Sequence, residues 1–392
     1  MLTYAVTQVA VTPLFASMPL QQQSDAVLPH PQGLRRVVLA TTIAESSLTL
    51  PGVTAVVDSG LRRISCYEPA TGMSGLKTVP ISAASAQQRA GRAGRVAAGI
   101  CVRLWPEREA LSPHTSPQIE LDDLAGLALT LAVWGAPTPA AIAALQWVTP
   151  PPPHALSEAH DLLRGLGAME YGEGGGLRVT RHGRALARLP LHPRLAHMLL
   201  LAPRIGGARA VSIACAIAAL IEERDILSDP RSVGAHVLPR VTALLATSPG
   251  AGVDEVRWAR ARRGMAELRQ KIAEEIEIGA DLPLEDEETR MEEEEMVGVL
   301  LAIGFPDRVA QLQKGKSNSF SLANGRAAAF ASNSEQLGRV PYIVAGAQFT
   351  CFTGTKVQIL TQNEQPPLTG PTGRPRACGW RLRSQACARM RT

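Results

Sequence analysis

The stretch VVLATTIAESSLTLPGVTAVVDSG, from Val37 to Gly60, decides how the first part of this 392-residue chain folds. It contains two short apolar runs, VVLA and VTAVV, which are separated by a polar turn. A third run, ICVRLW, begins at Ile100. Runs of this kind are typical of strands in a parallel sheet that is covered on both faces. We therefore predict an α/β domain over residues 1–110.

Segments on either side of these runs extend the same domain. The opening MLTYAVTQVAVTPLFASMPL has no basic leader and no small-residue cleavage site, so it is interpreted as a strand and turn rather than a signal peptide. Between Leu61 and Pro80, LRRISCYEPATGMSGLKTVP has two extended arms around a Pro, Thr and Gly turn. This pattern predicts a β-hairpin that projects from the domain.

After Trp105 the pattern becomes helical, with apolar residues at spacings of three and four in LDDLAGLALTLAVWG and SEAHDLLRGLGAME. The stretch from Leu166 to Leu186 then predicts a strand, a glycine turn, a strand and a helix. Together these elements predict a winged-helix-like module over residues 111–183. Residues 184–303 are mostly helical in pattern and predict a helical bundle.

The end of the chain is less regular. Within a C-terminal segment over residues 304–365, the sequence from Phe305 to Phe330 predicts short strands and turns. Residues 366–392 are rich in arginine and little patterned, which predicts a disordered tail. The acidic run 274–295 has a single basic residue, Arg290. A solvated helix face or a linker is favoured over a partner-binding role for this run.

Composition limits the function only loosely. The net charge of +5 and pI near 9.0 favour a polyanionic partner such as RNA, but an ordinary mildly basic protein fits equally well. Arg204 and Arg209 interrupt the apolar stretch from Leu195 to Leu220, so we expect a core helix and no membrane span. Six cysteines without a C-x-x-C pair favour reduced thiols in a cytoplasmic protein, with no zinc site.

The stretch QQRAGRAGR, Gln87 to Arg95, is the main candidate for chemistry. It sets Arg89, Arg92 and Arg95 three residues apart, which places their guanidinium groups along one edge of a predicted helix start. Guanidinium forks donate bidentate hydrogen bonds and stabilise the charge that grows on a transferring phosphoryl group. Taken alone, however, this triplet fits a plain basic helix better than a catalytic one.

The order in which the motifs occur favours a catalytic role for the arginines over a plain basic helix. ATTIAESSLTL, VVDSG, the predicted hairpin and QQRAGRAGR follow one another between Ala40 and Arg95, and together they resemble motifs V and VI of the DEAH-box RNA helicases. LARLPLHPRLAHMLL and LLAIGFPDRVAQ, the latter followed by LANGR, are similar to the HrpB-type subgroup. The resemblance runs from Val11 to Arg326. It implies an α/β plus α architecture, with a partial RecA-like lobe followed by winged-helix and helical-bundle domains and an HrpB-type C-terminal segment.

The resemblance also implies roles for single residues. On the nucleotide side, Gln88 would hold the attacking water, and Arg92 and Arg95 would act as arginine fingers on the γ-phosphate. Arg89 and Gly91 would complete the ATP-binding group, with Arg89 mainly structural. Asp58 belongs to the same group, where it would brace the segment together with Glu45. On the RNA side, three residues would contact the backbone without reading its sequence: Thr42, Ser47 and Thr49.

Some positions depart from the family pattern. Thr42 stands where an Asn is usual, Ser46 where Thr is usual, and Pro51 where an acidic residue is usual. Val27 aligns loosely with the aromatic residue that stacks on adenine. These differences predict weaker nucleotide affinity than in a typical member.

A phosphoryl-transfer site also needs a glycine-rich phosphate loop and acidic residues for Mg²⁺. The sequence contains no D-E-x-H, and AQLQKGKS from Ala310 is a poor phosphate loop because no strand precedes it and no helix opening follows. ATP with Mg²⁺ would therefore be held by a first RecA-like lobe outside this chain, on a separate chain for example, and the chain alone is predicted to be inactive. Two alternatives stay open: an RNA-binding or regulatory fragment, and a non-functional remnant.

Overall fold

The computed structural model describes residues 9–16, 18–46, 50–68, 72–95, 97–173, 175–278, 291–316, 318–323, 325, 327–330, 340–345 and 357–360. Predictions for the centre of the acidic run, residues 279–290, and for the tail, residues 366–392, fall outside these residues and stay predictions.

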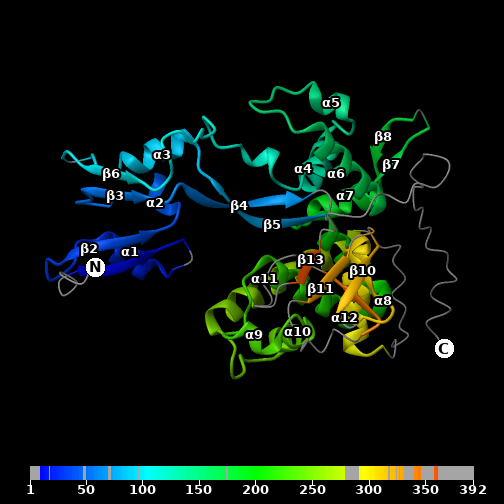
Figure 1. Cartoon of the computed structure of the whole chain (residues 1–392). Coiled ribbons are helices and arrows are strands. Elements are labelled where there is room, and N and C mark those ends of the chain that lie inside the picture. The colour runs from blue at the N-terminus through cyan, green and yellow to red at the C-terminus, as the bar shows by residue number, and fades with distance from the viewer. Residues whose placement is uncertain are drawn as a thin grey trace.

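The N-terminal region is built on two separate pairs of parallel strands (Figure 1). Strand β1 pairs with β2, and β3 pairs with β6, so the predicted strands at the opening and in the three apolar runs are confirmed. Three short helices accompany the strands. The bounds of these elements are β1 Val9–Leu14, α1 Leu20–Val27, β2 Arg35–Ala40, α2 Ile43–Ser46, β3 Ala55–Asp58, α3 Ala83–Ala90 and β6 Ile100–Arg103.

The expectation that this sheet is covered on both faces is wrong for the described residues. Val37 is 47% exposed, Leu39 is 60% exposed and Val57 is 69% exposed. The reason is that each of the two parallel pairs, β1–β2 and β3–β6, has no third described strand, so neither pair has a central strand with neighbours on both sides. The short helices cover little of the surface of these pairs.

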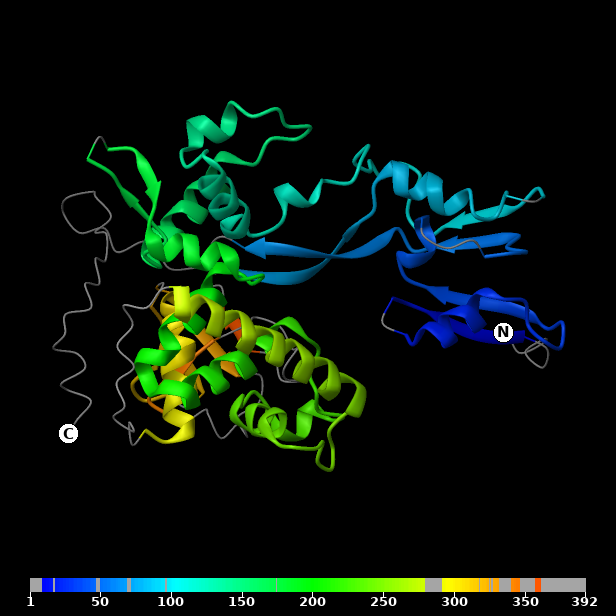
Figure 2. The same ribbon diagram turned by 180° about the vertical axis from the view of Figure 1, so that it is seen from behind.

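The predicted hairpin is confirmed. Strands β4 (Leu61–Glu68) and β5 (Met73–Pro80) pair antiparallel from Leu61↔Pro80 to Glu68↔Met73. The hairpin runs from the N-terminal strands to the helical part of the molecule, as Figures 1 and 2 show from opposite sides. With eight residue pairs it is the longest strand pairing among the described residues, and it joins these two regions.

The order predicted for a winged-helix-like module, a helix, two paired strands and a helix, is present. Thr180 begins the last helix, since its side chain accepts a hydrogen bond from the Gly183 N–H at 2.9 Å. Gly183 has no space for a side chain, because a Cβ there would lie 2.1 Å from the Ala168 carbonyl oxygen. The elements are η2 Gln118–Glu120, α4 Ala125–Trp134, α5 Pro139–Ala143, α6 Pro153–Gly165, β7 Met169–Tyr171, β8 Leu177–Val179 and α7 Arg181–Arg188.

A long helix, α8 (Pro193–Glu222), forms the centre of the following helical region. By length and composition it is the one described helix that could cross a membrane, yet half of its most apolar window is buried in the protein. Gly206 and Gly207 have non-helical backbone angles, so α8 is two helical segments joined at a kink. The observed burial confirms the predicted core helix.

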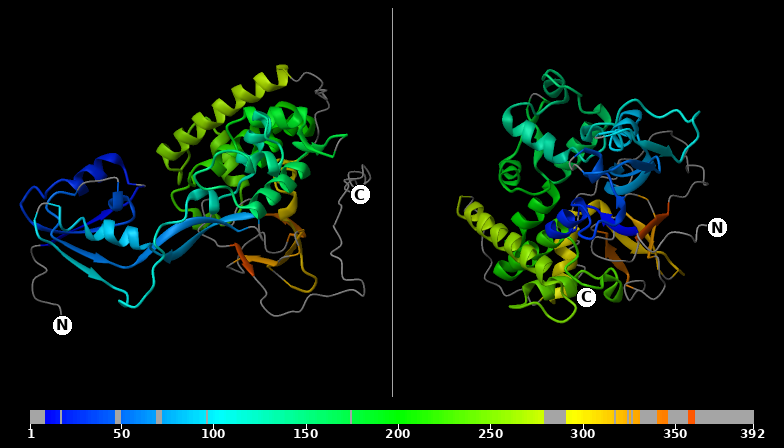
Figure 3. Two further views of the ribbon diagram at one scale, coloured as in Figure 1. Left: turned by 90° about the horizontal axis from the view of Figure 1, so that it is seen from above. Right: turned by 90° about the vertical axis from the view of Figure 1, so that its left-hand side faces the viewer.

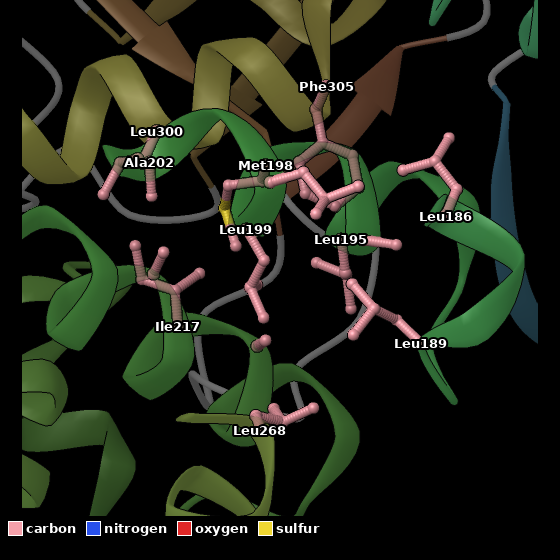
Figure 4. Packing of buried hydrophobic residues seen from close by; sticks show 14 of the residues in the cluster. Leu186, Leu189, Leu195, Met198, Leu199, Ala202, Ile217, Leu268, Leu300 and Phe305 are labelled. Atoms are coloured by element: carbon pink, nitrogen blue, oxygen red, sulfur yellow. The ribbon is translucent and has the colours of Figure 1, made fainter. Parts of the chain in front are cut away.

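Helices α11 and α12 pack on α8, and α10 lies against it (Figures 1 and 3). Leu195, Met198 and Leu199 of α8 are each at most 2% exposed, and Figure 4 shows them close to Leu268 of α11 and to Phe305. Burial of such side chains contributes roughly 1.5–3 kcal/mol each. The predicted helical character of this region is confirmed: α9 Pro230–Val233, α10 Leu238–Leu245, α11 Glu255–Ile278 and α12 Glu293–Gly304.

The C-terminal part folds as a five-stranded sheet in the order β12-β9-β10-β11-β13. Strands β9, β10 and β11 lie between Phe305 and Phe330, where short strands and turns were predicted, whereas β12 and β13 were not predicted. In AQLQKGKS, the residues from Ala310 to Leu312 belong to β9, and the turn that follows leads into the antiparallel strand β10 rather than into a helix. The expectation that no strand leads into this stretch is therefore wrong, since β9 begins at Val309, but the expectation that no helix opens after it is confirmed. The elements are η3 Pro306–Arg308, β9 Val309–Leu312, β10 Ser319–Leu322, β11 Ala327–Phe330, β12 Tyr342–Val344 and β13 Val357–Leu360.

A histidine pair at the junction of α7 and α8 predicts a pH-dependent stability. His182 Nε2 lies 2.7 Å from His197 Nδ1, and burial, followed by the nearby charge of His182, lowers the pKa of His197 to about 4. Below pH of about 6.5 the unfolded chain binds a proton at His197 that the folded chain does not bind. The contribution of His197 to the free energy of unfolding is therefore fully present above pH of about 6.5 and is lost as the pH falls towards 4. We expect a loss on the order of 1–2 kcal/mol between pH 7 and pH 5.

Urea unfolding at both pH values measures this loss. His197→Gln should reduce the difference, because glutamine does not titrate, while burial also lowers the pKa of His182 and His160 and leaves part of it. His114→Gln, at an exposed position, serves as the matched control and should keep it. An equal difference in wild type and His197→Gln would contradict this assignment.

Candidate functional site

The arginine-containing stretch begins as a helix and ends as a turn. Ser82 begins α3, since its hydroxyl accepts a hydrogen bond from the Ser85 N–H at 3.1 Å. The helix ends at Ala90, and the chain continues as a turn in which the Arg92 N–H donates to the Arg89 carbonyl at 3.1 Å. The expectation that all three arginines follow one edge of a helix start is wrong. Arg89 lies in the last helical turn, and Arg92 and Arg95 lie beyond it, where the two glycines of the stretch favour a turn.

Arg89 joins three segments that are distant in sequence. Its Nε lies 3.1 Å from Glu45 Oε2, and its Nη1 lies 2.8 Å from Asp58 Oδ1. Ser85 adds a third contact by donating its hydroxyl to Glu45 Oε1 at 2.5 Å. The Asp58 side chain is 1% exposed, and those of Arg89 and Glu45 are about 16% and 15% exposed. Arg89 therefore braces α3 against α2 and β3. The predicted contacts of Arg89 and Asp58 with ATP stay predictions.

Arg92 is held by the backbone of α2. Its Nε donates to the Glu45 carbonyl oxygen at 3.1 Å, and its Nη2 donates to the same oxygen. Burial lowers the pKa of Arg92, and the positive charge of Arg95 lowers it further, while Glu45 opposes the change. Arg92 and Arg95 therefore bring two positive charges close together at the turn. This concentration of charge suits an anion such as a phosphate group.

The other predicted nucleotide-side residues lie on the same helix and turn, where Gln88, Gly91 and Arg95 are exposed. On the predicted RNA side, Thr42 is exposed immediately before α2, and its carbonyl accepts the Glu45 N–H at 3.0 Å. The structure thus brings Thr42 and the arginine turn together through one residue, Glu45.

The remaining predicted RNA contacts, Ser47 and Thr49, lie outside the described residues. No group of three His, Cys, Asp or Glu side chains in the described part of the chain could hold a metal ion. The guanidinium groups of the arginine turn are suited to an anion, whereas Mg²⁺ is bound by oxygen ligands.

Two supporting residues were not predicted from the sequence. Ser85 could have been recognised, because Ser82 three residues earlier is a typical N-cap and fixes where α3 begins. Trp105 could not have been recognised from the sequence. Its ring packs on Gly60, where a Cβ would lie 2.6 Å from ring atom Cε3 and where φ is +72°. Gly60 also donates its N–H to Asp58 Oδ1 at 3.0 Å, so Trp105 supports the turn that orients Asp58.

Comparison with known proteins agrees with this geometry. Residues 1–97 match the family described as helicase conserved C-terminal domain. Among curated proteins, the ATP-dependent RNA helicase HrpB of Escherichia coli is 33% identical over 342 residues, which are 86% of this chain and 37% of that protein. The ATP-dependent RNA helicase HrpA homolog of Haemophilus influenzae is 42% identical over 201 residues, which are 50% of this chain and 15% of that protein.

Solved structures give the same result. The crystal structure of the E. coli DExH-box NTPase HrpB has a TM-score of 0.67 and 32% identity, with 86% of this chain and 36% of that chain covered. A second structure, of the Escherichia coli DEAH/RHA helicase HrpB, has a TM-score of 0.68 and 30% identity, with 92% and 41% covered.

The parallel strand pairs, the hairpin and the arginine turn therefore make up a helicase C-terminal domain. Over 86% of its length, that domain included, the chain is a homologue of the DEAH/RHA helicase HrpB. It spans about 37% of the length of this curated relative.

Proposed function

We propose that the chain is the C-terminal portion of an ATP-dependent RNA helicase of HrpB type, which couples ATP hydrolysis to RNA binding and unwinding. The observation that carries the proposal is the arginine turn, fixed to α2 through Glu45. The proposed units are a helicase lobe over 1–110, a winged-helix-like module over 111–183, a helical bundle over 184–303 and a C-terminal segment over 304–365. The cytoplasm is the proposed location.

In this proposal, Arg92 and Arg95 stabilise the negative charge that develops on the γ-phosphate during transfer. ATP supplies that phosphate, with its Mg²⁺ held mainly by a first RecA-like lobe. Gln88 orients the attacking water, and Gly91 allows the close approach of a phosphate to the backbone. Arg89 and Asp58 keep the turn in place.

RNA binding is assigned to the segment around α2. Thr42, together with Ser47 and Thr49, would contact the backbone of single-stranded RNA and would therefore not distinguish sequences. Since Glu45 lies in α2 and accepts hydrogen bonds from both Arg89 and Arg92, a shift of α2 upon RNA binding would reach the arginine turn.

A second candidate function is that of an RNA-binding or regulatory fragment without catalysis. It is favoured by the sequence, which has no D-E-x-H and no phosphate loop that precedes a helix. The two candidates share the RNA contacts and differ only in whether the arginine turn meets a bound nucleotide.

The distinguishing experiment measures ATP turnover of the purified chain with and without the separately purified first RecA-like lobe of E. coli HrpB, in the presence of single-stranded RNA. We expect turnover at background for the chain alone, RNA binding that weakens with salt, and RNA-stimulated turnover after the lobe is added. RNA binding without any turnover in the mixture would favour the fragment. Turnover by the chain alone would contradict the assignment of the phosphate site to another lobe.

A further inference from the structure

One end of the hairpin β4–β5 packs against the C-terminal sheet, and its described residues there, Tyr67, Glu68, Gly72 and Met73, are called its tip. Met73, the first residue of β5, is 2% exposed and belongs to a hydrophobic cluster that is otherwise formed by the C-terminal part of the chain. The other buried members of this cluster are Ala310, Phe320, Leu322, Ala328 and Ala345. Met73 therefore fills part of the core of a sheet whose strands begin more than two hundred residues later in the sequence.

Polar groups hold the tip in the same place. Arg308 donates a hydrogen bond from Nη2 to the Gly72 carbonyl oxygen, and the Tyr67 N–H donates to the Leu121 carbonyl at 2.6 Å. Gly72 has a φ of +65°, and a Cβ there would lie 3.1 Å from Asp307 Oδ2. Burial, and next the charge of Asp123, raise the pKa of Tyr67 to about 12, as expected for a phenol enclosed at an interface.

The residues that hold the tip are themselves fixed to the helical region. Asp307 accepts two hydrogen bonds from Arg194 of α8, at 2.5 and 3.0 Å. The Arg194 side chain is 4% exposed. The ring of Phe305 lies below the guanidinium groups of Arg194 and Arg308, at 5.7 and 4.6 Å. A paired, buried arginine of this kind has little freedom to move.

At its other end, the hairpin is continuous with the arginine turn. Strand β5 ends at Pro80, and the next residue, Ile81, is 1% exposed and donates its N–H to the Gly60 carbonyl at 2.9 Å. Arg89 donates from Nη1 to the Leu61 carbonyl at 3.3 Å, at the first residue of β4. No flexible linker therefore separates the hairpin from α3.

Eight residue pairs connect the two ends without a bulge. An isolated two-stranded hairpin is only marginally stable in water, so the contacts at its ends decide its position and rigidity. We infer that the hairpin is a rigid link that couples the arginine turn to the C-terminal sheet, with Met73 and Arg308 as its anchor. Loosening the anchor loosens α3, although Met73 lies at the end of the hairpin opposite α3. The coupling itself does not depend on the proposed function. Only its consequence for catalysis by the arginines rests on the proposed function.

Hydrogen exchange of the full chain, monitored by mass spectrometry, tests the link. Met73→Ala removes the side chain from the cluster, and we expect the amides from Ser85 to Arg92 to exchange about tenfold faster, which corresponds to about 1.4 kcal/mol. Met265→Ala is the matched control, because Met265 is equally buried, at 4% exposure, in the helical core. It should leave exchange in α3 unchanged.

Arg308→Gln is a second variant that removes the hydrogen bond to Gly72 and leaves Met73 in place. Arg308→Gln should also accelerate amide exchange in α3. If Met73→Ala does not fold, Arg308→Gln alone tests the link. Faster exchange in β9, β10 and β11 with unchanged exchange in α3 would overturn the link. Neither readout uses ATP, so failure of the proposed function and failure of the link are distinguishable.

Discussion

Arg95→Ala is expected to lower RNA-stimulated ATP turnover by about 10³-fold or more, measured on the chain together with a first RecA-like lobe. Arginine fingers contribute about 10³ to 10⁵ in kcat, because the guanidinium stabilises charge that appears only in the transition state. Arg95 is exposed at the end of the turn, next to Arg92, and its removal leaves the contacts of Glu45 with Arg89 and Arg92 intact. The loss should therefore appear in kcat, with RNA affinity and folding unchanged.

Arg260→Ala is the control for loss of one positive charge. Arg260 lies on α11, its side chain is 62% exposed, and its partner Glu223 is 3.7 Å away. This variant should keep normal turnover. Arg89→Ala should behave differently from both, since it removes the brace between Glu45 and Asp58 and should lower thermal stability together with turnover. If Arg95→Ala retained the turnover of Arg260→Ala, its role as a finger would be rejected.

The fold was predictable from the sequence where the signal is local. The strands around Val37, Val56 and Ile100 follow from short apolar runs, and the hairpin follows from two extended arms around a turn. The exposure of Val37 and Val57 was not predictable, because an apolar run indicates a strand but does not say how many neighbours that strand has. The kink in α8 lies at Gly206 and Gly207, a dipeptide that marks turns, but the apolar residues on both sides of it predicted one core helix from Leu195 to Leu220.

The site was predictable in its residue types but not in its contacts. The spacing of the arginines identified the candidates, whereas the pairing of Arg89 with Glu45 joins residues 44 positions apart. The contact of Arg308 with Gly72 spans 236 positions. Such contacts depend on how whole elements pack, and no local pattern in the sequence encodes them.

Asp225→Ala is expected to destabilise the helical region by about 3–5 kcal/mol. Asp225 follows α8 and is bound by Arg240 of α10, with Nε at 3.0 Å and Nη2 at 2.9 Å from Oδ2. The Arg240 side chain is 0% exposed, and that of Asp225 is 6% exposed. Removing the carboxylate leaves a buried guanidinium charge without its counter-ion, and the cost of that charge exceeds the value of the pair itself. Urea unfolding followed by circular dichroism measures the change.

The exposed pair of Arg178 and Glu170 separates burial from ion pairing, because its N···O distance of 2.8 Å is nearly the same while its side chains are 63% and 50% exposed. Glu170→Ala should cost at most about 1 kcal/mol, since water solvates the remaining arginine. If burial causes the large effect, replacing both buried partners, Asp225→Leu with Arg240→Met, should recover most of the stability that Asp225→Ala loses. A double variant as unstable as Asp225→Ala would instead mean that the Asp225 carboxylate acts mainly through its hydrogen bond from the Leu227 N–H, at 3.0 Å.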